Sequence, residues 1–215
     1  MKQEDFFDEQ IVDMINQAEQ NTADFVLDSL KEETMQIETE KPSIGDGVKI
    51  LGKWIYFEKR KLANDTVIMM LPTNFVPMNL EAARLKYPSE HRPETILTDE
   101  TGTVNFMFQY MNGEVTNTTI EAFRNQVFGM MKRVNPGMKE REMGTVNVTG
   151  KQIAYVEFSN TTIDGKLYNL MFYLEVNGQP LMGSFNCQTK EMKYWREIVF
   201  QMIQSIEIIG KEEKS

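Results

Sequence analysis

Tight-turn dipeptides between runs of alternating hydrophobic residues constrain this chain more than any other feature. Asn112-Gly113 follows an alternating run from Thr103 to Tyr110. Asn177-Gly178 separates a run from Lys166 to Val176 from another, from Leu181 to Cys187. Asn-Gly pairs are typical of hairpins because type I′ turns need positive φ at both central residues. Strands joined by so few residues must be antiparallel, so the sequence predicts an antiparallel sheet.

Further strands with the same alternation are expected on both sides of these hairpins. Val104, Phe106, Phe108 and Tyr110 recur at every second position, which predicts one buried face. Pro72 ends a predicted strand that begins at Thr66. The remaining signals are the alternating run from Trp54 to Lys59, the hairpin of 145–148 and 152–158 around Thr149-Gly150-Lys151, and the turn Asp164-Gly165.

Two long helices and one short helix interrupt the predicted strands. The first long helix is expected from Thr119 to Val134, with Thr118 and Glu121 as a capping box. Its apolar stripe comprises Ile120, Phe123, Val127, Met130, Met131 and Val134. The second is expected from Lys190 to Ser205, with a stripe of Met192, Trp195, Ile198, Val199, Met202, Ile203 and Ile206. A short helical turn is expected over 79–86, so the fold class is α+β: a curved antiparallel sheet flanked by helices.

The net charge of −9 is concentrated at the N-terminus. Residues 1–40 hold 12 acidic residues and two lysines, whereas the other 175 residues carry 20 acidic and 21 basic groups. We expect an acidic helical extension over 1–40, a linker over 41–49, an α+β domain over 50–209 and a charged tail over 210–215. The extension is interpreted either as a solvated helical pair resting on the domain or as a partner-binding arm. The acidic balance argues against nucleic acid as a partner.

Residues that commonly carry catalysis or bind cofactors are scarce. Cys187 is the single cysteine and His91 the single histidine, and no metal-ligand spacing surrounds them. Gly45-Asp46-Gly47 resembles the start of a dinucleotide loop, but Ile50 occupies the third glycine position. We expect Cys187 and Trp195 to be core residues, and we expect no catalytic residue, cofactor or metal site.

Three stretches resemble the PsbP-like fold group, most closely its bacterial DcrB-like branch. They are the strand and proline exit 66–72, the segment 86–93 followed by Val104-Asn105-Phe106, and Phe185-Asn186-Cys187 leading to Trp195 and to Gln204-Ser205-Ile206. The resemblance covers about residues 50–209. It implies a curved antiparallel sheet between helical layers, and roles that are mostly non-catalytic, such as assembly factor, small-GTPase partner, photosystem II accessory protein or secretion-associated chaperone. Many DcrB-like members resemble lipoproteins, whereas no export signal is evident here.

The candidate partner-binding residues come from one loop and from some of the 16 methionines. Tyr87, His91 and Arg92 lie in a segment that Pro88 and Pro93 hold extended. The alternative is that Tyr87 covers the sheet edge while Arg92 pairs with a neighbouring glutamate. Most methionines fall at core positions, among them Met69, Met70, Met107, Met130, Met131, Met171, Met182, Met192 and Met202. Those nearer loops, Met78, Met111, Met138 and Met143, are candidates for an adaptable groove.

The expected function is a non-enzymatic protein-interaction module, with adaptor or chaperone work linked to secretion or assembly as its concrete form. The partner is a protein whose identity the sequence does not give. The alternative is a small-molecule or lipid-binding protein with an apolar pocket between sheet and helix. A hydrolase built on Cys187 and His91 is a distant third hypothesis. Without a signal sequence or a long apolar run, we expect a cytoplasmic protein with no membrane span and no bound nucleic acid.

Overall fold

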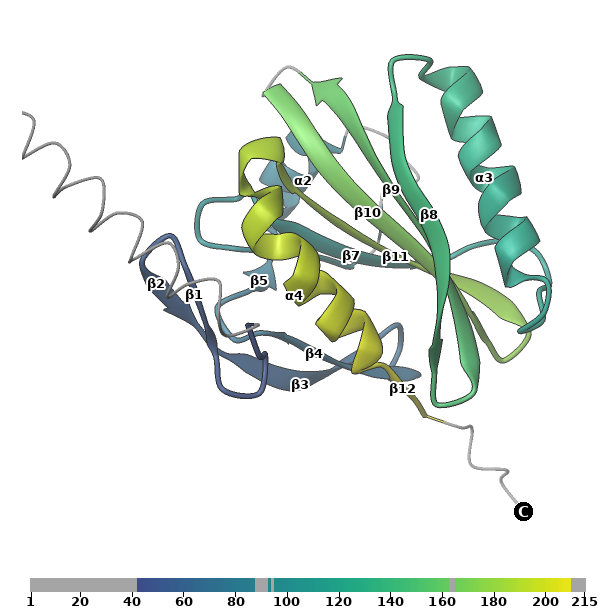
Figure 1. Ribbon diagram of the computed structural model, residues 1–215, viewed down its shortest axis with the longest axis horizontal. Helices are drawn as coiled ribbons and strands as arrows, with labels where there is room; N and C mark the ends of the chain where they lie inside the picture. The colour runs from purple at the N-terminus through teal and green to yellow at the C-terminus, as the bar shows by residue number, and fades with distance from the viewer. Residues whose placement is uncertain (1–41, 88–92, 94, 163–164, 210–215) are drawn as a thin grey trace, which may run out of the picture. The chain divides into compact units, whose positions relative to one another are not determined.

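The computed structural model describes residues 42–87, 93, 95–162 and 165–209, all of which belong to one compact unit beginning at Pro42. The acidic extension over 1–40, the tail over 210–215, His91, Arg92 and Asp164 lie outside the described residues. The described part contains a seven-stranded antiparallel sheet, a three-stranded sheet, a two-stranded hairpin and three α-helices (Figure 1).

The seven-stranded sheet has the order β5-β6-β7-β11-β10-β9-β8. Its strands are β5 (Val76–Pro77), β6 (Thr95–Thr98), β7 (Asn105–Tyr110), β8 (Lys139–Val148), β9 (Lys151–Thr162), β10 (Gly165–Val176) and β11 (Gln179–Gln188). The two-residue turns Thr149-Gly150 and Asn177-Gly178 both have positive φ at each position, as type I′ geometry requires. The hairpins predicted at Thr149-Gly150 and Asn177-Gly178 are therefore confirmed, whereas Asn112-Gly113 leads from β7 toward α3 (Ile120–Val134) and joins no pair of strands.

Two smaller sheets are built mostly from strands that precede the large sheet in the chain. The three-stranded sheet has the order β12-β4-β3, built from β3 (Phe57–Leu62), β4 (Val67–Pro72) and β12 (Glu207–Ile208). The hairpin pairs β1 (Val48–Ile50) with β2 (Lys53–Ile55). Val48 and Ile50 are buried in the main core, and the backbone N–H of Ile44 donates to Oε1 of Gln201 over 3.1 Å. Part of the segment expected as a linker over 41–49 therefore packs on the domain.

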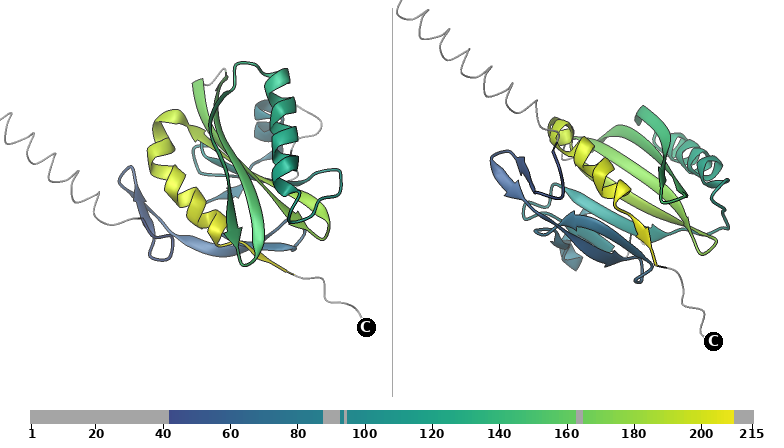
Figure 2. Two further views of the ribbon diagram at one scale, coloured as in Figure 1. Left: turned by 45° about the vertical axis from the view of Figure 1, so that its right-hand side comes forward. Right: turned by 60° about the horizontal axis from the view of Figure 1, so that its bottom comes forward.

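The helices cover opposite faces of the large sheet (Figure 2). Helix α4 (Met192–Gln204), preceded by the 3-10 turn η1 (Thr189–Glu191), packs on the face that carries Phe106, Phe172 and Phe185. The three-stranded sheet contributes to the same core through β4. Helix α3 (Ile120–Val134) packs on the other face, against β9 and β10. Helix α2 (Leu80–Lys86) lies on that second face too, over β6 and β7. The layers confirm the predicted α+β class.

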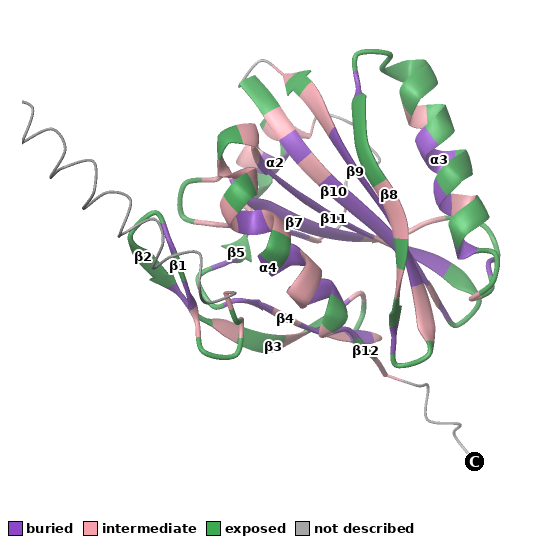
Figure 3. Ribbon diagram, viewed as in Figure 1, coloured by how far each residue is buried: buried purple, intermediate pink, exposed green. Residues whose placement is uncertain are grey.

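The predicted stripe of α4 is confirmed, because Trp195, Ile198, Val199, Met202 and Ile203 are all buried. Figure 3 shows this buried stripe beside the buried central strands.

The predicted stripe of α3 is wrong at its C-terminal end. Val134 is 87% exposed and Met130 is 48% exposed, while Phe128 and Arg124 are buried instead. The predicted capping box is also absent: Thr119 is the N-cap, and Glu121 pairs with Arg124 over 3.0 Å. Met130 and Val134 therefore give the last turn of α3 an exposed apolar side.

Candidate functional site

Among the described residues, helices cover the two ends of the α2/α3 face of the large sheet, and a cleft lies between them. Helix α2 packs over the β6–β7 side through Ala83, which contacts Ile96 and Met107. Helix α3 packs over the β9–β10 side. A cleft of about 580 Å³ lies between the two helices, with the central strands β11 and β10 in its floor. We call it the methionine cleft, and its size falls in the range of binding pockets.

Six methionines give the cleft its character. They come from the strands of the floor, from the end of α3 and from the turn after it: Met107, Met130, Met131, Met138, Met171 and Met182. A thioether side chain is unbranched and polarizable, so such a surface adapts to the shape of what binds there. The other lining residues are Tyr87, Pro93, Val134, Asn135, Phe158, Asn160, Asn169, Ser184 and Asn186.

Strand register places these side chains in rows across the sheet. Met107 on β7 pairs with Ser184 on β11, which pairs with Met171 on β10. The next row on the same face is made of asparagines: Asn105 pairs with Asn186, which pairs with Asn169. Because side chains alternate between the faces of a strand, all of these residues lie on the α2/α3 side.

The asparagine row is joined by hydrogen bonds that leave the cleft floor ordered. Asn105 Nδ2 donates to Asn186 Oδ1 over 2.9 Å, and Asn186 Nδ2 donates to the Tyr87 hydroxyl over 3.3 Å. Burial raises the pKa of Tyr87, so this phenol is neutral at physiological pH. Asn169 Nδ2 donates to Asn160 Oδ1 over 2.7 Å. The network fixes one wall of the cleft to its floor.

Ser184 is the exception in this ordered floor. Its side chain lies between Met107 and Met171 and lines the cleft, although the residue is only 7% exposed. Among the described residues, its hydroxyl has no hydrogen-bond partner. None of the described residues that line the cleft is an acid, a lysine, an arginine or a histidine. The site therefore offers an apolar surface with one neutral hydroxyl and neutral amides, and it disfavours a buried charge.

The structure brings one of the five predicted site residues into this cleft. Tyr87, at the C-cap of α2, lines it. Met78 packs beneath α2 beside Tyr87, and Met111 packs on the apolar cluster under α3; neither belongs to the cleft lining. His91 and Arg92 lie outside the described residues.

The cleft methionines were interpreted from the sequence as core, apart from Met138. The alternation of side chains along the strands does, however, place Met107 and Met171 on the α2/α3 face. Met107 is out of phase with Phe106 and Phe108, and Met171 is out of phase with Leu170 and Phe172. One face of these strands is aromatic and the other thioether, which distinguishes the two layers.

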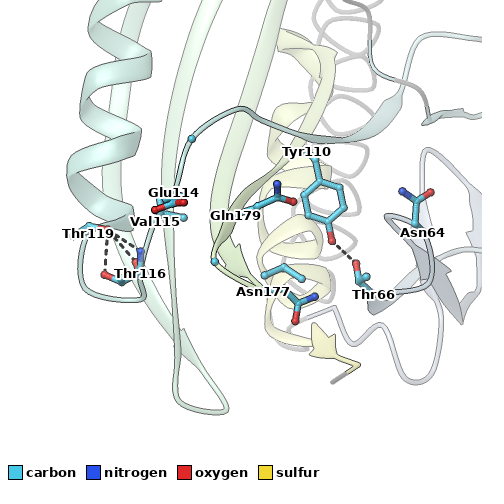
Figure 4. Close-up of a pocket in the computed structure, with 12 residues that line it drawn as sticks. Asn64, Thr66, Tyr110, Glu114, Val115, Thr116, Thr119, Asn177 and Gln179 are labelled. Carbon is cyan, nitrogen blue, oxygen red and sulfur yellow. Dashed lines mark hydrogen bonds between the residues drawn. The ribbon is translucent and has the colours of Figure 1, made fainter. Parts of the chain in front are cut away.

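A second hollow is lined mostly by polar residues (Figure 4). Its volume is about 1010 Å³, and its lining includes Asn64, Tyr110, Glu114, Asn177 and Gln179. Several of its polar groups already have partners. The Thr66 and Tyr110 hydroxyls lie 2.6 Å apart, and the backbone N–H of Thr116 donates to Thr119 Oγ1 over 2.9 Å. Polar groups make up a larger share of the surface of this hollow than of the methionine cleft.

The α4 face holds a network of ionisable side chains around one buried carboxylate. Glu157 is fully buried and accepts hydrogen bonds from Arg196 Nη2 over 2.6 Å and from the Tyr168 hydroxyl over 2.8 Å. These hydrogen bonds to Glu157 raise the pKa of Arg196. The same Arg196 Nη2 donates to Glu142 over 2.7 Å, which links α4 to β8 and β9. The arrangement is a paired clamp between helix and sheet, formed by a buried carboxylate, a partly exposed guanidinium and an exposed second carboxylate.

Cys187 lies in the core of this face, as predicted. It is fully buried, and burial raises the pKa of its thiol, which disfavours the thiolate that a nucleophile needs. Within the described ranges, histidine, cysteine and acidic side chains do not gather in groups of three that could hold a metal ion.

Comparisons with known proteins define the fold. No family model matches the chain, and no curated protein matches it. The solution structure of cyanobacterial PsbP (CyanoP) from Synechocystis sp. PCC 6803 is similar with a TM-score of 0.54 at 10% identity, over 80% of this chain and 99% of that one. LpqN of Mycobacterium tuberculosis, described as involved in cell envelope biogenesis, has a TM-score of 0.48 at 8% identity, over 73% and 92%. A crystal structure from Bacteroides thetaiotaomicron VPI-5482 has a TM-score of 0.46 at 12% identity, and the match covers 74% of this chain and 50% of that one.

The chain therefore has a PsbP-like fold, in which a seven-stranded antiparallel sheet carries helices on both faces. At these identities the likeness concerns the fold, and one fold hosts many functions. In the described part of the chain, no helix combines the length and the apolar character needed to cross a membrane.

Proposed function

We propose that this protein is a non-catalytic interaction module whose methionine cleft receives an apolar segment of a protein partner. The observation that carries the proposal is the cleft at the centre of the α2/α3 face, which six methionines line. Methionine-rich surfaces are used by proteins that accommodate partner helices.

Exposed apolar residues beside the cleft favour a protein over a small ligand. On α3, Met130 is 48% exposed and Val134 is 87% exposed. Met130 and Val134 line the cleft, so the apolar surface continues from its floor onto the outside of α3. A contiguous exposed apolar surface is a feature of protein interaction sites, and a small molecule that filled the cavity would leave this outer part uncovered.

Adaptor or chaperone work linked to secretion or assembly, in a cytoplasmic protein of the DcrB-like branch, is the concrete form of this proposal. The stretches that carry the DcrB-like resemblance contribute directly to the cleft. Residues 86–93 supply Tyr87 and Pro93, and residues 185–187 supply Asn186. The resemblance and the cleft thus share these three residues.

A small neutral amphiphile is the second candidate occupant, because of Ser184. A hydroxyl that lines the cleft between two methionines fits a ligand with an apolar body and one uncharged polar group. Native mass spectrometry of the freshly purified full chain separates the two candidates. A retained small molecule of defined mass favours the amphiphile, and its absence favours the protein segment.

The test of the proposed function is a binding titration with a designed helical peptide. The peptide carries leucines at i, i+3, i+4 and i+7, uncharged flanks and a fluorescent label, and fluorescence anisotropy reports its affinity for the full chain. Met130→Glu and Val134→Glu should each weaken binding by about tenfold or more, since each places a charge on the proposed contact surface.

Leu51→Glu is the matched control, because Leu51 is an exposed apolar residue on the β1–β2 turn, away from the lining of the cleft. It should leave the affinity unchanged. Thermal melts of all three variants verify that each is folded. Equal loss of affinity in all three variants, or no loss in any, would show that the cleft does not receive the segment.

A further inference from the structure

The walls of the methionine cleft differ in charge from its floor. The lining is uncharged, but basic side chains stand directly beside it. Arg84 precedes Tyr87 by three positions on α2, and Arg133 follows Met130 by three positions on α3. Residues three apart on a helix are neighbours on its surface. One arginine therefore adjoins the cleft on each of its two helical walls.

These arginines are available to a partner. Arg84 and Arg133 are both exposed, and neither forms an ion pair with another described residue. Lys139 follows the lining residue Met138. It is also exposed and forms no ion pair with another described residue. By contrast, Lys132 on the opposite side of α3 pairs with Glu140 over 3.3 Å. The cleft thus has an apolar floor between positively charged margins.

The width of the cleft fits a single helix. The lining residues Met107, Ser184 and Met171 form one row across β7, β11 and β10, so this row crosses two strand spacings. At about 4.8 Å per spacing, the row is roughly 10 Å wide. An α-helix with its side chains is about 10–12 Å across. One helix would lie between α2 and α3 with its two flanks facing Arg84 and Arg133.

From the neutral floor, the basic margins and this width, we propose that the cleft recognises an amphipathic helix with acidic flanks. Its apolar stripe contacts the six methionines, and an uncharged polar side chain at the centre of that stripe hydrogen-bonds to the Ser184 hydroxyl. Glutamates or aspartates on either side of the stripe pair with Arg84 and Arg133. This inference rests on the proposed function, because it names the partner chemistry of the same cleft.

The experiment compares three peptides that share one leucine stripe and differ only in their flanks, which are glutamate, glutamine or lysine. Their affinities for the full chain are measured by fluorescence anisotropy at low and at high salt. We expect the glutamate peptide to bind most tightly and the lysine peptide most weakly, with a gap of roughly fivefold to thirtyfold at low salt for two surface ion pairs. The gap should shrink at high salt, since salt screens exposed charges.

The double variant Arg84→Glu/Arg133→Glu should reverse the order, so that the lysine peptide binds most tightly. Lys193→Glu on the exposed side of α4 adds a charge of the same sign elsewhere and should leave the order unchanged. If all three peptides bind equally and the Met130→Glu variant still loses them, the proposed function stands and the acidic-flank inference is overturned. If no peptide binds, the proposed function itself fails.

Discussion

The two faces of the seven-stranded sheet are built from the same strands yet differ in nearly every physical respect. On β10, Leu170, Phe172 and Leu174 belong to the α4 core, whereas Met171 and Tyr173 belong to the α3 side. The α4 face is closed by a helix and a second sheet, and it is rich in aromatic contacts such as Phe106 with Phe172. The α2/α3 face is open at its centre and rich in methionine and asparagine.

Side chains alternate between the two faces of each strand, so one face of a sheet can stabilise the fold while the other binds a partner. Large rigid rings fill a closed core well, because their shape complementarity leaves few voids. Flexible thioethers suit a surface that has to adapt. The comparison therefore predicts that changes on the α4 face reduce stability, whereas changes at the cleft reduce binding with little loss of stability.

The largest expected effect comes from breaking the buried ion pair of the α4 face. Arg196→Met would leave the fully buried Glu157 carboxylate without its bidentate partner, and this should cost about 3–5 kcal/mol of unfolding free energy. Urea denaturation measures the loss. The double variant Glu157→Gln/Arg196→Met removes the unpaired charge and should recover part of it. A single variant as stable as the natural protein would show that the clamp does not hold α4 to the sheet.

The next effect contrasts two neighbours on β11 that belong to opposite faces. A Cβ on Gly183 would lie 2.0 Å from Cζ of Phe172, so the ring occupies the space of any side chain there. Gly183→Ala should destabilise the protein by about 1–3 kcal/mol. Ser184 is the next residue on β11 and its side chain lies on the opposite face, in the cleft. Ser184→Ala should change the free energy of unfolding by no more than about 0.5 kcal/mol. Equal losses in the two denaturation curves would contradict a division of roles between the faces.

Two buried tyrosines on β10 give a smaller, matched contrast. The Tyr168 hydroxyl donates to Glu157, whereas the Tyr173 hydroxyl has no partner among the described residues. Tyr168→Phe should cost about 1–3 kcal/mol, because it removes a hydrogen bond to a buried carboxylate. Tyr173→Phe should be neutral or stabilising, since it removes an unpaired buried polar group. The comparison fails if Tyr173→Phe proves the more damaging of the two in thermal melts.

The smallest effect is a pH dependence on the alkaline side. Burial raises the pKa of both Tyr168 and Tyr173 above the ordinary value of 10.0. The native state therefore favours the neutral phenols, so their contribution is fully present below pH 10 and is lost as the pH rises beyond it. Urea midpoints should be flat just below pH 10 and fall above it. In the Tyr173→Phe variant the urea midpoint should fall less steeply with pH. An unchanged slope would show that other groups cause the fall.

Sequence patterns predicted the sheet better than they predicted the site. Asn177-Gly178 and Thr149-Gly150 define hairpins locally, because the turn conformation depends on those residues alone. The stripe of α4 was equally readable, since Trp195 and Ile198 face a closed core. The cleft depends on which part of a sheet a helix leaves uncovered, and that follows from the lateral positions of α2 and α3. Met107 and Met171 therefore looked like ordinary core residues.

The same limit explains the short strands that the sequence did not predict. β5 and β12 are two residues long, and β6 is four residues long. Runs this short carry too few alternating positions for a period to be recognised. Their pairing depends on neighbours far away in the chain, such as β12 against β4.

Methyl NMR of the methionines in the full chain tests the division between the two faces most directly. The protein is labelled at the methionine Cε methyl groups and titrated with the glutamate-flanked helical peptide. The account predicts shifts for the methyls of the six cleft methionines and unchanged signals for Met69 and Met202, which are fully buried in the α4 core. Shifts at Met69 and Met202 of similar size, or no shift at the cleft methionines, would contradict it.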